Sequence, residues 1–297
     1  MSANKLHPDE VNINKELVKQ LIEDQFPQWK NLPIKPIKVS GWDNRTFHLG
    51  DDMLVRMPSA EDYELQVEKE HKWLPKLAPL IPFPIPVPLA IGKPAEGYPW
   101  KWSIYSWLDG ETAASGYIEN LEDFAKSLAQ FLKALHKIDT TGGPLPGLHS
   151  FYRGASLKTY DAQTREAINI LKDKINTDVV TKIWEEAVAT EWQNSPVWVH
   201  GDISAGNLLV KDGKLSAVID FGQLTIGDPA CDLAIAWTFF DNKSREIFRE
   251  TLGLDNETWA RGKAWALWKA LIIAAGITEN SAEALKSLHT INEVLAD

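Results

Sequence analysis

Hydrophobic and polar positions follow two different periods along this chain. In the first part, short apolar segments of strand character are separated by turns, and residues 45–49 and 53–57 form a predicted hairpin across Gly50-Asp51-Asp52. In the second part, apolar residues recur at helical spacing over four segments: residues 121–136, 161–172, 179–192 and 257–275. The pattern predicts an α+β protein with a small antiparallel sheet followed by a mainly helical part.

A predicted helix in the first part, residues 61–77, carries an acidic residue on its apolar face. Glu70 shares that face with apolar and aromatic side chains: Tyr63, Val67, Leu74 and Leu77. A carboxylate on a buried face is costly unless a cation pairs with it. Arg56, in the neighbouring apolar strand, is the natural partner, so we expect an Arg56–Glu70 ion pair. A purely structural salt bridge is the alternative interpretation.

Residues 75–88 contain six prolines and interrupt the periodic pattern. Proline lacks a backbone donor and clashes with the preceding helical turn, so we expect this segment not to be helical. It is predicted to be an extended connector that leads into a strand over residues 87–91.

A group of polar residues is framed by apolar runs in the second part. These runs are residues 197–199, 208–210 and 215–219. An Asp212-Gly213 pair separates the last two runs and is a strong hairpin signal. Asn207 precedes one hairpin strand, Asp220 follows the other, and Asp202 lies on the loop that leads into the hairpin. We therefore expect two carboxylates and a carboxamide oxygen to converge at one edge of a small sheet.

These side chains suit phosphoryl transfer. Oxygen ligands of this kind bind a hard cation such as Mg²⁺, and a separate carboxylate can accept a hydroxyl proton as a general base. The alternative is that polar residues simply gather at wet strand ends. That alternative explains each residue taken singly better than it explains the whole set with its spacing.

The motif His200-x-Asp202-x4-Asn207, followed by Asp220-Phe221-Gly222, resembles the catalytic loop and metal-binding motif of kinase-like phosphotransferases. Together with the run from Gly227 to Ala234, it resembles the aminoglycoside phosphotransferase family, which is related to choline and macrolide kinases. The resemblance implies a bilobal protein-kinase-like fold, with a nucleotide-binding lobe in residues 1–107 and a helical catalytic and substrate-binding lobe in residues 108–297. The short interval between Asp220 and Asp228 leaves no room for the activation segment of a protein kinase.

The resemblance also implies roles for individual residues. Asp202 would be the base, with His200 bracing the loop, and Asn207 and Asp220 would hold Mg²⁺. Asp232 would anchor the catalytic loop by hydrogen bonding. Asp228 is expected to cap a helix that runs to residue 240.

Nucleotide binding is expected in the first part of the chain. Arg56, fixed by Glu70, would clamp the phosphates; the family usually has lysine here, and arginine is planar and bidentate. The remaining nucleotide-contacting residues are implied to be Ser40 and Asn44 near the phosphates and Ser106 and Leu108 near the adenine. The residues leave the choice between ATP and GTP open, and Tyr105, at the expected gatekeeper position, bears on it.

The composition narrows the partners. The 297 residues carry a formal net charge of −10, which argues against nucleic acid and suits a cationic small molecule. The single cysteine, Cys231, excludes an internal disulfide and fits a reducing compartment. No apolar run approaches the length of a membrane span and no signal-peptide core is present, so we expect a cytoplasmic protein without a membrane partner. A monomer or weak dimer is expected.

The predicted activity is ATP- or GTP-dependent phosphorylation of a small-molecule hydroxyl, with an aminoglycoside as the first acceptor class. A macrolide or another metabolite is an alternative acceptor, and a nucleotide-binding pseudokinase is an alternative from another class. Against a pseudokinase, every base and metal position is filled. Trp265 and Trp268, three apart on one helix, either pack in the core or form the floor of a substrate pocket. Resistance to an antibiotic is a property of a cell and does not follow from the residues.

Overall fold

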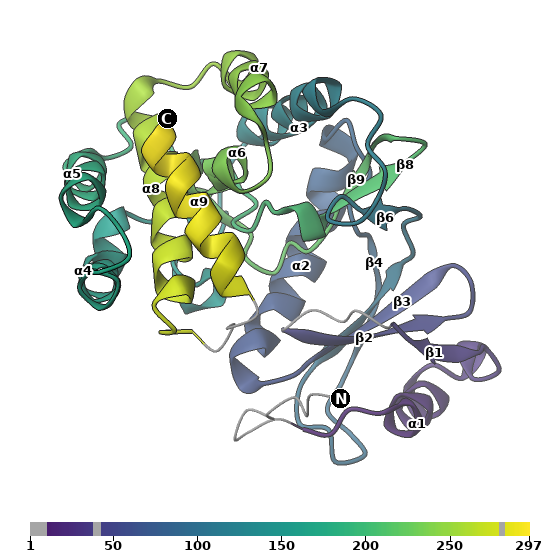
Figure 1. Ribbon diagram of the computed structural model, residues 1–297. Coiled ribbons are helices and arrows are strands. Elements are labelled where there is room, and N and C mark those ends of the chain that lie inside the picture. The colour runs from purple at the N-terminus through teal and green to yellow at the C-terminus, as the bar shows by residue number, and fades with distance from the viewer. Residues whose placement is uncertain (1–10, 38–42, 279–282) are drawn as a thin grey trace. The chain divides into compact units, whose positions relative to one another are not determined.

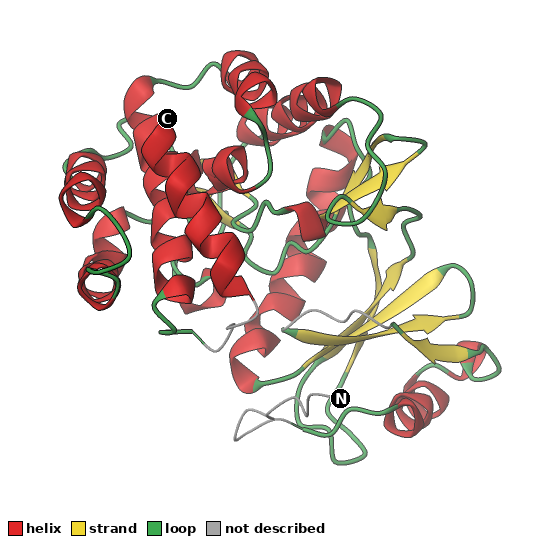
Figure 2. Ribbon diagram, in the orientation of Figure 1, coloured by secondary structure: helices red, strands yellow, loops and turns green. Residues whose placement is uncertain are grey.

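The structure of the protein is a computed structural model that describes residues 11–37, 43–278 and 283–297. It divides the chain into two compact units, each described by itself below (Figures 1 and 2). Unit 1 comprises Met1–Leu80, Pro84–Asp109 and Val218–Gly222. Unit 2 comprises Ile81–Phe83, Gly110–Ala217 and Gln223–Asp297.

Unit 1 is built on a five-stranded antiparallel sheet in the order β1-β2-β3-β5-β4. The strands are β1 (Ile34–Pro36), β2 (Asn44–Leu49), β3 (Met53–Pro58), β4 (Pro88–Gly92) and β5 (Trp102–Ser106). Alternate residues such as Phe47, Leu49 and Val55 enter a buried core with residues of α1 (Lys15–Gln25). The predicted hairpin over β2 and β3 is confirmed.

Helix α2 (Glu64–Leu77) follows a short 3-10 helix (Glu61–Tyr63) and packs on β4 and β5. Val67, Leu74 and Leu77 are buried along one face, and Glu70 is buried with them. The predicted apolar stripe is therefore correct, including its carboxylate.

The prediction that residues 75–88 contain no helix is wrong at their start. Pro75 lies inside α2, and Ala78–Leu80 forms a 3-10 helix. A proline in a helix costs about 3 kcal/mol, whereas burying a leucine side chain contributes about 1.5–3 kcal/mol. Leu74 and Leu77 are both fully buried on either side of Pro75, so their burial offsets the lost helical hydrogen bond.

Unit 2 is mainly helical and centres on α8 (Asn256–Ala274), most of whose residues are buried. The other helices are α3 (Leu121–His136), α4 (Asp161–Ile170), α5 (Thr177–Val188), α6 (Ile235–Thr238), α7 (Asn242–Leu252) and α9 (Ala284–Ala296). Helix α8 packs against α4, α5 and α9, and α3 packs against α7 (Figure 1). Along the part of the chain that the structure describes, no helix combines the length and the apolar character needed to cross a bilayer.

Two small sheets frame the loop that carries Asp202. Strand β7 (Val197–Val199) pairs antiparallel with β10 (Thr225–Gly227), and β8 (Leu208–Lys211) lies between β6 (Glu111–Thr112) and β9 (Lys214–Val218). The β8–β9 hairpin is the one predicted from the Asp212-Gly213 pair. Both turn residues have positive φ, 53° and 75°, as a tight two-residue hairpin turn requires.

The segment after Asp228 was predicted to be one helix to residue 240. This prediction is wrong about the type and the length of the helix. Pro229–Ala234 is a 3-10 helix, and only the four residues of α6 are α-helical. The segment is almost wholly buried and packs tightly on α8, where a Cβ on Gly262 would lie 2.6 Å from that of Leu233. Close packing on α8 and the anchoring contacts of Asp232 hold this segment in the tighter helix.

Candidate active site

One buried carboxylate, that of Asp232, holds the backbone of the loop between β7 and β8. Asp232 Oδ2 accepts the His200 N–H at 2.8 Å, and its Oδ1 accepts the Gly201 N–H, also at 2.8 Å. Both Asp232 and His200 are fully buried. The predicted anchoring of the loop by Asp232 is therefore present. Burial raises the pKa of Asp232 to about 7, although the two N–H groups act in the opposite direction.

Gly201 permits the turn that carries the loop past this anchor. Its φ is +87°, a region that residues with a Cβ rarely adopt. A Cβ here would also lie 2.7 Å from the carbonyl oxygen of Gln223 and 3.2 Å from the Cβ of Arg153. Steric constraints thus explain why glycine stands at the central position of the His-Gly-Asp motif.

Asp202 and Asn207 are joined at the two ends of the loop. The Asn207 side-chain nitrogen donates to the Asp202 backbone carbonyl at 2.9 Å and to Asp202 Oδ2 at 3.0 Å. The Asp202 N–H donates to His200 Nδ1 at 3.2 Å, so the neutral imidazole carries its proton on Nε2. His200 therefore contacts the backbone of Asp202, and its role in bracing the loop stays a prediction. Because the Asn207 nitrogen makes both contacts, its side-chain oxygen keeps the ligand character that a hard cation needs.

Lys269 on α8 was not predicted, and it contacts the proposed base. Its Nζ lies 3.3 Å from Asp202 Oδ1, and in this ion pair the Lys269 side chain is exposed and that of Asp202 is partly exposed. Burial acts to raise the pKa of Asp202, but the charges of Lys269 and Arg153 outweigh it, so the pKa lies below the ordinary value. The sequence held one signal for this residue: Lys269 is a cation within the mainly apolar run from Trp265 to Ile273.

Replacing this lysine is expected to change the pH dependence of turnover. In Lys269→Met the pKa of Asp202 rises, because a cation that stabilised the carboxylate is gone. The acid limb of the kcat/KM profile should therefore move to higher pH than in the wild type. Lys263 lies on the same helix as Lys269 and pairs with Asp297, away from Asp202. Lys263→Met is therefore the control and should leave the acid limb of the profile in place. An unchanged limb in Lys269→Met would show that Asp202 is not the group that titrates.

A second cation beside the loop is enclosed by aromatic rings. Arg153 is buried, and its guanidinium lies 4.9 Å from the ring centre of Trp268 and 5.1 Å from that of Trp265. Its Nη1 also donates to the Tyr160 hydroxyl at 3.4 Å. Trp265 and Trp268 are themselves buried and pack edge to face. Of the two interpretations given for these tryptophans, the geometry favours packing in the core.

In unit 1, Arg56 bridges two carboxylates. Its Nη1 lies 3.3 Å from Glu70 Oε1, and its Nη2 lies 2.7 Å from Asp220 Oδ1. The predicted Arg56–Glu70 ion pair is therefore present, and the link to Asp220 is an addition. Tyr105, expected at a gatekeeper position, donates its hydroxyl to Glu70. Burial acts to lower the pKa of Arg56, but Asp220 and Glu70 outweigh it and raise the pKa.

The segment that carries Asp220 is held against α2 within this unit. Asp220 itself has a positive φ of 65°. Lys69 Nζ donates to the Gly222 carbonyl at 2.7 Å, and a Cβ on Gly222 would lie 2.5 Å from the amide oxygen of Gln66. These contacts fix the direction in which Asp220 leaves the backbone and explain why it reaches Arg56.

The other predicted nucleotide-binding residues are placed as follows. Asn44 begins β2 and is buried, Ser106 ends β5, and Leu108 follows it, partly buried. The Ser106 N–H is already used by the Val87 carbonyl at 3.0 Å, so of its backbone groups only the carbonyl suits an adenine. Ser40 lies outside the described residues.

The metal ligands predicted from the sequence belong to different units, Asn207 to unit 2 and Asp220 to unit 1. Across the described ranges, His, Cys, Asp and Glu side chains do not gather in threes as a protein-only metal site would require. Mg²⁺ commonly takes one or two protein oxygens and completes its shell with water and phosphate oxygens. The donor types of these two side chains therefore fit Mg²⁺ bound together with a nucleotide.

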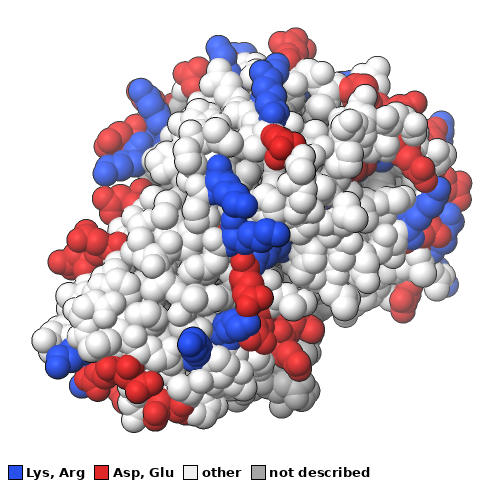
Figure 3. Space-filling model, turned by 180° about the vertical axis from the view of Figure 1, so that it is seen from behind, with Lys and Arg blue, Asp and Glu red and all other residues white. Residues whose placement is uncertain are grey.

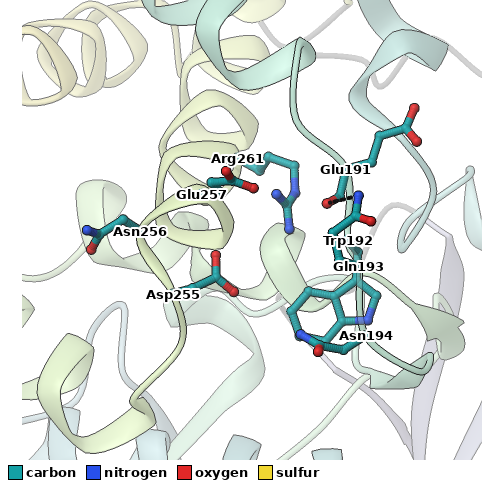
Figure 4. Close-up of a pocket in the computed structure, with 8 residues that line it drawn as sticks. All are labelled: Glu191, Trp192, Gln193, Asn194, Asp255, Asn256, Glu257 and Arg261. Carbon is teal, nitrogen blue, oxygen red and sulfur yellow. Dashed lines mark hydrogen bonds between the residues drawn. The ribbon is translucent and has the colours of Figure 1, made fainter.

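A hollow of about 400 Å³ in unit 2 is lined by none of the predicted site residues (Figure 4). Its lining consists of Glu191, Trp192, Gln193, Asn194, Asp255, Asn256, Glu257 and Arg261. Arg261 is paired with Asp228 at 2.7 Å, and Asp255 caps α8 by accepting the Thr258 N–H at 2.7 Å. These polar groups have structural partners, so we assign no chemistry to the hollow.

Comparison with known proteins places the chain among phosphotransferases. The model of the phosphotransferase enzyme family matches residues 33–265. An aminoglycoside 3'-phosphotransferase of Salmonella typhimurium is 29% identical over 168 residues, which cover 52% of this chain and 59% of that protein. The uncharacterized protein YcbJ of Bacillus subtilis (strain 168) is 24% identical over 188 residues, 61% of this chain and 56% of that protein. The chain thus spans less than two thirds of the length of these curated relatives.

Solved structures with the same fold extend over nearly the whole chain. An aminoglycoside 2'-phosphotransferase-IIIa in complex with GDP gives a TM-score of 0.75 at 18% identity, covering 95% of this chain and 98% of that one. The apoenzyme of macrolide 2'-phosphotransferase MphH from Brachybacterium faecium gives 0.63 at 18% identity, covering 93% and 98%. At such low identity the likeness concerns the fold, and it confirms the predicted α+β, bilobal kinase-like class.

Proposed function

Because the chain belongs to the phosphotransferase enzyme family, we propose that it transfers a phosphoryl group from a nucleoside triphosphate to a hydroxyl group of a small molecule. The observation that carries the proposal is the catalytic loop. Asp202 is held there by His200 and Asn207, and Asp232 fixes the loop backbone. A partly exposed carboxylate on a rigid loop suits a general base, because phosphoryl transfer depends mainly on positioning and charge neutralisation.

In the proposed reaction, the acceptor hydroxyl gives its proton to Asp202 as its oxygen bonds to the terminal phosphorus. The bond from that phosphorus to the bridging oxygen breaks, and the nucleoside diphosphate leaves with the bond's electron pair. Asn207 and Asp220 would hold Mg²⁺, which when bound neutralises charge on the phosphate oxygens. Arg56, oriented by Glu70, would contact the phosphates, while Asn44, Ser40, Ser106 and Leu108 would contact the rest of the nucleotide. Residues 1–107 would thus bind the nucleotide, and residues 108–297 the acceptor.

ATP and GTP are both proposed as donors to be compared. The solved relatives include complexes with GDP and with ADP, which supports a purine nucleotide. The names of the relatives support aminoglycosides as the first acceptors to assay and macrolides as the second. We also propose a cytoplasmic location and a monomer or weak dimer.

The proposal is tested by Mg²⁺-dependent nucleotide consumption with a panel of hydroxylated compounds. Turnover should require Mg²⁺, and Asp220→Asn should raise the Mg²⁺ concentration for half-maximal rate. Loss of a residue that only supports a metal ligand typically weakens metal affinity by about 10- to 100-fold. Asp220→Asn removes a direct carboxylate ligand, so the increase should be at least this large.

Asp173→Asn, which changes an exposed aspartate between α4 and α5, is the control and should keep the wild-type Mg²⁺ dependence. Nucleotide binding without Mg²⁺-dependent turnover of any compound would contradict the proposal and favour a binding-only role.

A further inference from the structure

We propose that the acceptor of this enzyme carries an anionic group beside its reacting hydroxyl, and that Lys269 binds this group. The inference rests on the proposed function, because it concerns the acceptor that Asp202 would deprotonate. It names a charge class, a hydroxylated acid, in place of the polycationic acceptor expected from the overall charge of the chain.

The two oxygens of Asp202 have different neighbours. Oδ2 accepts a hydrogen bond from Asn207 at 3.0 Å, and Oδ1 faces Lys269 Nζ at 3.3 Å. Both oxygens therefore accept a hydrogen bond, and the one from Lys269 is the longer and the more exposed of the two. An acceptor hydroxyl displaces this contact more easily and is directed to Oδ1. A molecule bound at Oδ1 therefore lies within contact distance of the Lys269 ammonium.

The Lys269 side chain can exchange its partner. It is 48% exposed, and the side chain of Asp202 is 26% exposed, so the pair is reached from solvent. At such exposure an ion pair contributes little net stability, so an incoming anion can bind the ammonium in place of Asp202 at small cost.

A polycationic acceptor would be favoured by several negative charges near Asp202. The groups beside Asp202 include two cations as well. Lys269 and the buried Arg153 both act on Asp202, and they oppose the charges of Asp202 and Asp232. Asp228, a further carboxylate of this unit, is neutralised by Arg261 at 2.7 Å. A polycation that approached Asp202 would have to displace the Lys269 ammonium and would be repelled by the charge of Arg153.

The net charge of −10 does not change this conclusion, because it is distributed over the molecule. On the face shown in Figure 3, acidic and basic side chains are intermixed and do not form a patch of one sign. Salt screens exposed charges beyond about 8–10 Å, so the groups beside Asp202 dominate the selection of an acceptor.

The inference is tested with three sugars that share hydroxyl groups and differ in charge: gluconate, glucose and glucosamine. With the full chain, Mg²⁺ and the preferred nucleotide, kcat/KM should fall in that order, and gluconate should exceed glucosamine by about 10-fold or more. In Lys269→Met this ratio should fall to near unity, and in Lys269→Glu it should invert. Lys269→Arg should retain the order. Lys263→Met, on the same helix, should retain the wild-type ratio and controls for loss of a lysine.

The ratio is the readout because removing Lys269 also changes the base itself. A wild-type preference for glucosamine, or for kanamycin over gluconate, would overturn the inference, as would an unchanged ratio in Lys269→Met. If the three sugars are poor acceptors, their binding is compared by calorimetry, and absence of the same charge order there would overturn it equally. Mg²⁺-dependent nucleotide turnover that persists in these cases shows that the inference has failed and the proposed function has not.

Discussion

Replacing Asp202 by asparagine should nearly abolish phosphoryl transfer. The variant keeps the size of the side chain and the backbone contacts of the loop, but its amide cannot accept a hydroxyl proton. General-base catalysis contributes about 10²- to 10⁴-fold, so kcat should fall by that factor. Single-turnover kinetics with a compound that the wild type phosphorylates measure this loss directly.

Nucleotide binding separates a lost base from a lost fold in this variant. The nucleotide-contacting residues proposed above lie elsewhere in the chain, so calorimetry with Mg²⁺ and nucleotide should give nearly wild-type affinity. Asp161→Asn is the matched control: Asp161 pairs with Arg165 on α4, outside the catalytic loop, and its replacement should leave kcat close to normal. Wild-type turnover in Asp202→Asn would assign the base to another group.

Replacing Asp232 by alanine should destabilise the protein strongly. The variant leaves the N–H groups of His200 and Gly201 buried without their acceptor. Each unsatisfied buried donor costs about 1–3 kcal/mol, so loss of the acceptor for two donors should lower the free energy of unfolding by about 2–6 kcal/mol. Urea denaturation of the two proteins, followed by tryptophan fluorescence, measures the difference.

The matched control for Asp232 is Asp241, which caps α7 by accepting the Ser244 N–H at 2.9 Å near the surface. Asp241→Ala should cost only about 0.5–2 kcal/mol, the usual effect of losing a helix cap. Asp232→Asn should fall between wild type and Asp232→Ala, because the amide oxygen can accept one of the two N–H groups. Equal losses in Asp232→Ala and Asp241→Ala would show that Asp232 does not anchor the loop.

The Asp202 and Asp232 variants test the same arrangement. The proposed base, Asp202, lies on a loop whose backbone is hydrogen-bonded to Asp232. If Asp232→Ala folds well enough to assay, its kcat should fall even where the population of folded protein is restored at low temperature. The reason is that Asp202 loses its fixed position, and small displacements of a catalytic group are costly in phosphoryl transfer.

Local patterns predicted the elements around the site. The Asp212-Gly213 pair predicted the β8–β9 hairpin because a two-residue turn with positive φ needs such residues. The place of Glu70 on an apolar helix face predicted its pairing with Arg56, because a buried carboxylate needs a cation. In both cases the physical requirement is met by residues close in the sequence or by a periodicity that the sequence displays.

Other contacts were not predicted, and each joins distant parts of the chain. Arg56 meets Asp220, 164 residues further along, and Lys269 meets Asp202 over 67 residues. Pro75 stayed helical because burial of Leu74 and Leu77 exceeded a local penalty. No local pattern encodes these outcomes, since they depend on which surfaces pack together.

The sequence by itself determined the family and the α+β class, and it predicted the candidate catalytic loop, base and metal ligands. Those features depend on spacing and residue type, which are visible in one dimension. Only the tertiary structure decided which charges act on Asp202, because the packing of unit 2 brings Lys269 into contact with it and places the charge of Arg153 within its electrostatic influence. The electrostatic character of the acceptor site is therefore a property of the folded unit, where separations of a few ångströms decide which charge acts on which group.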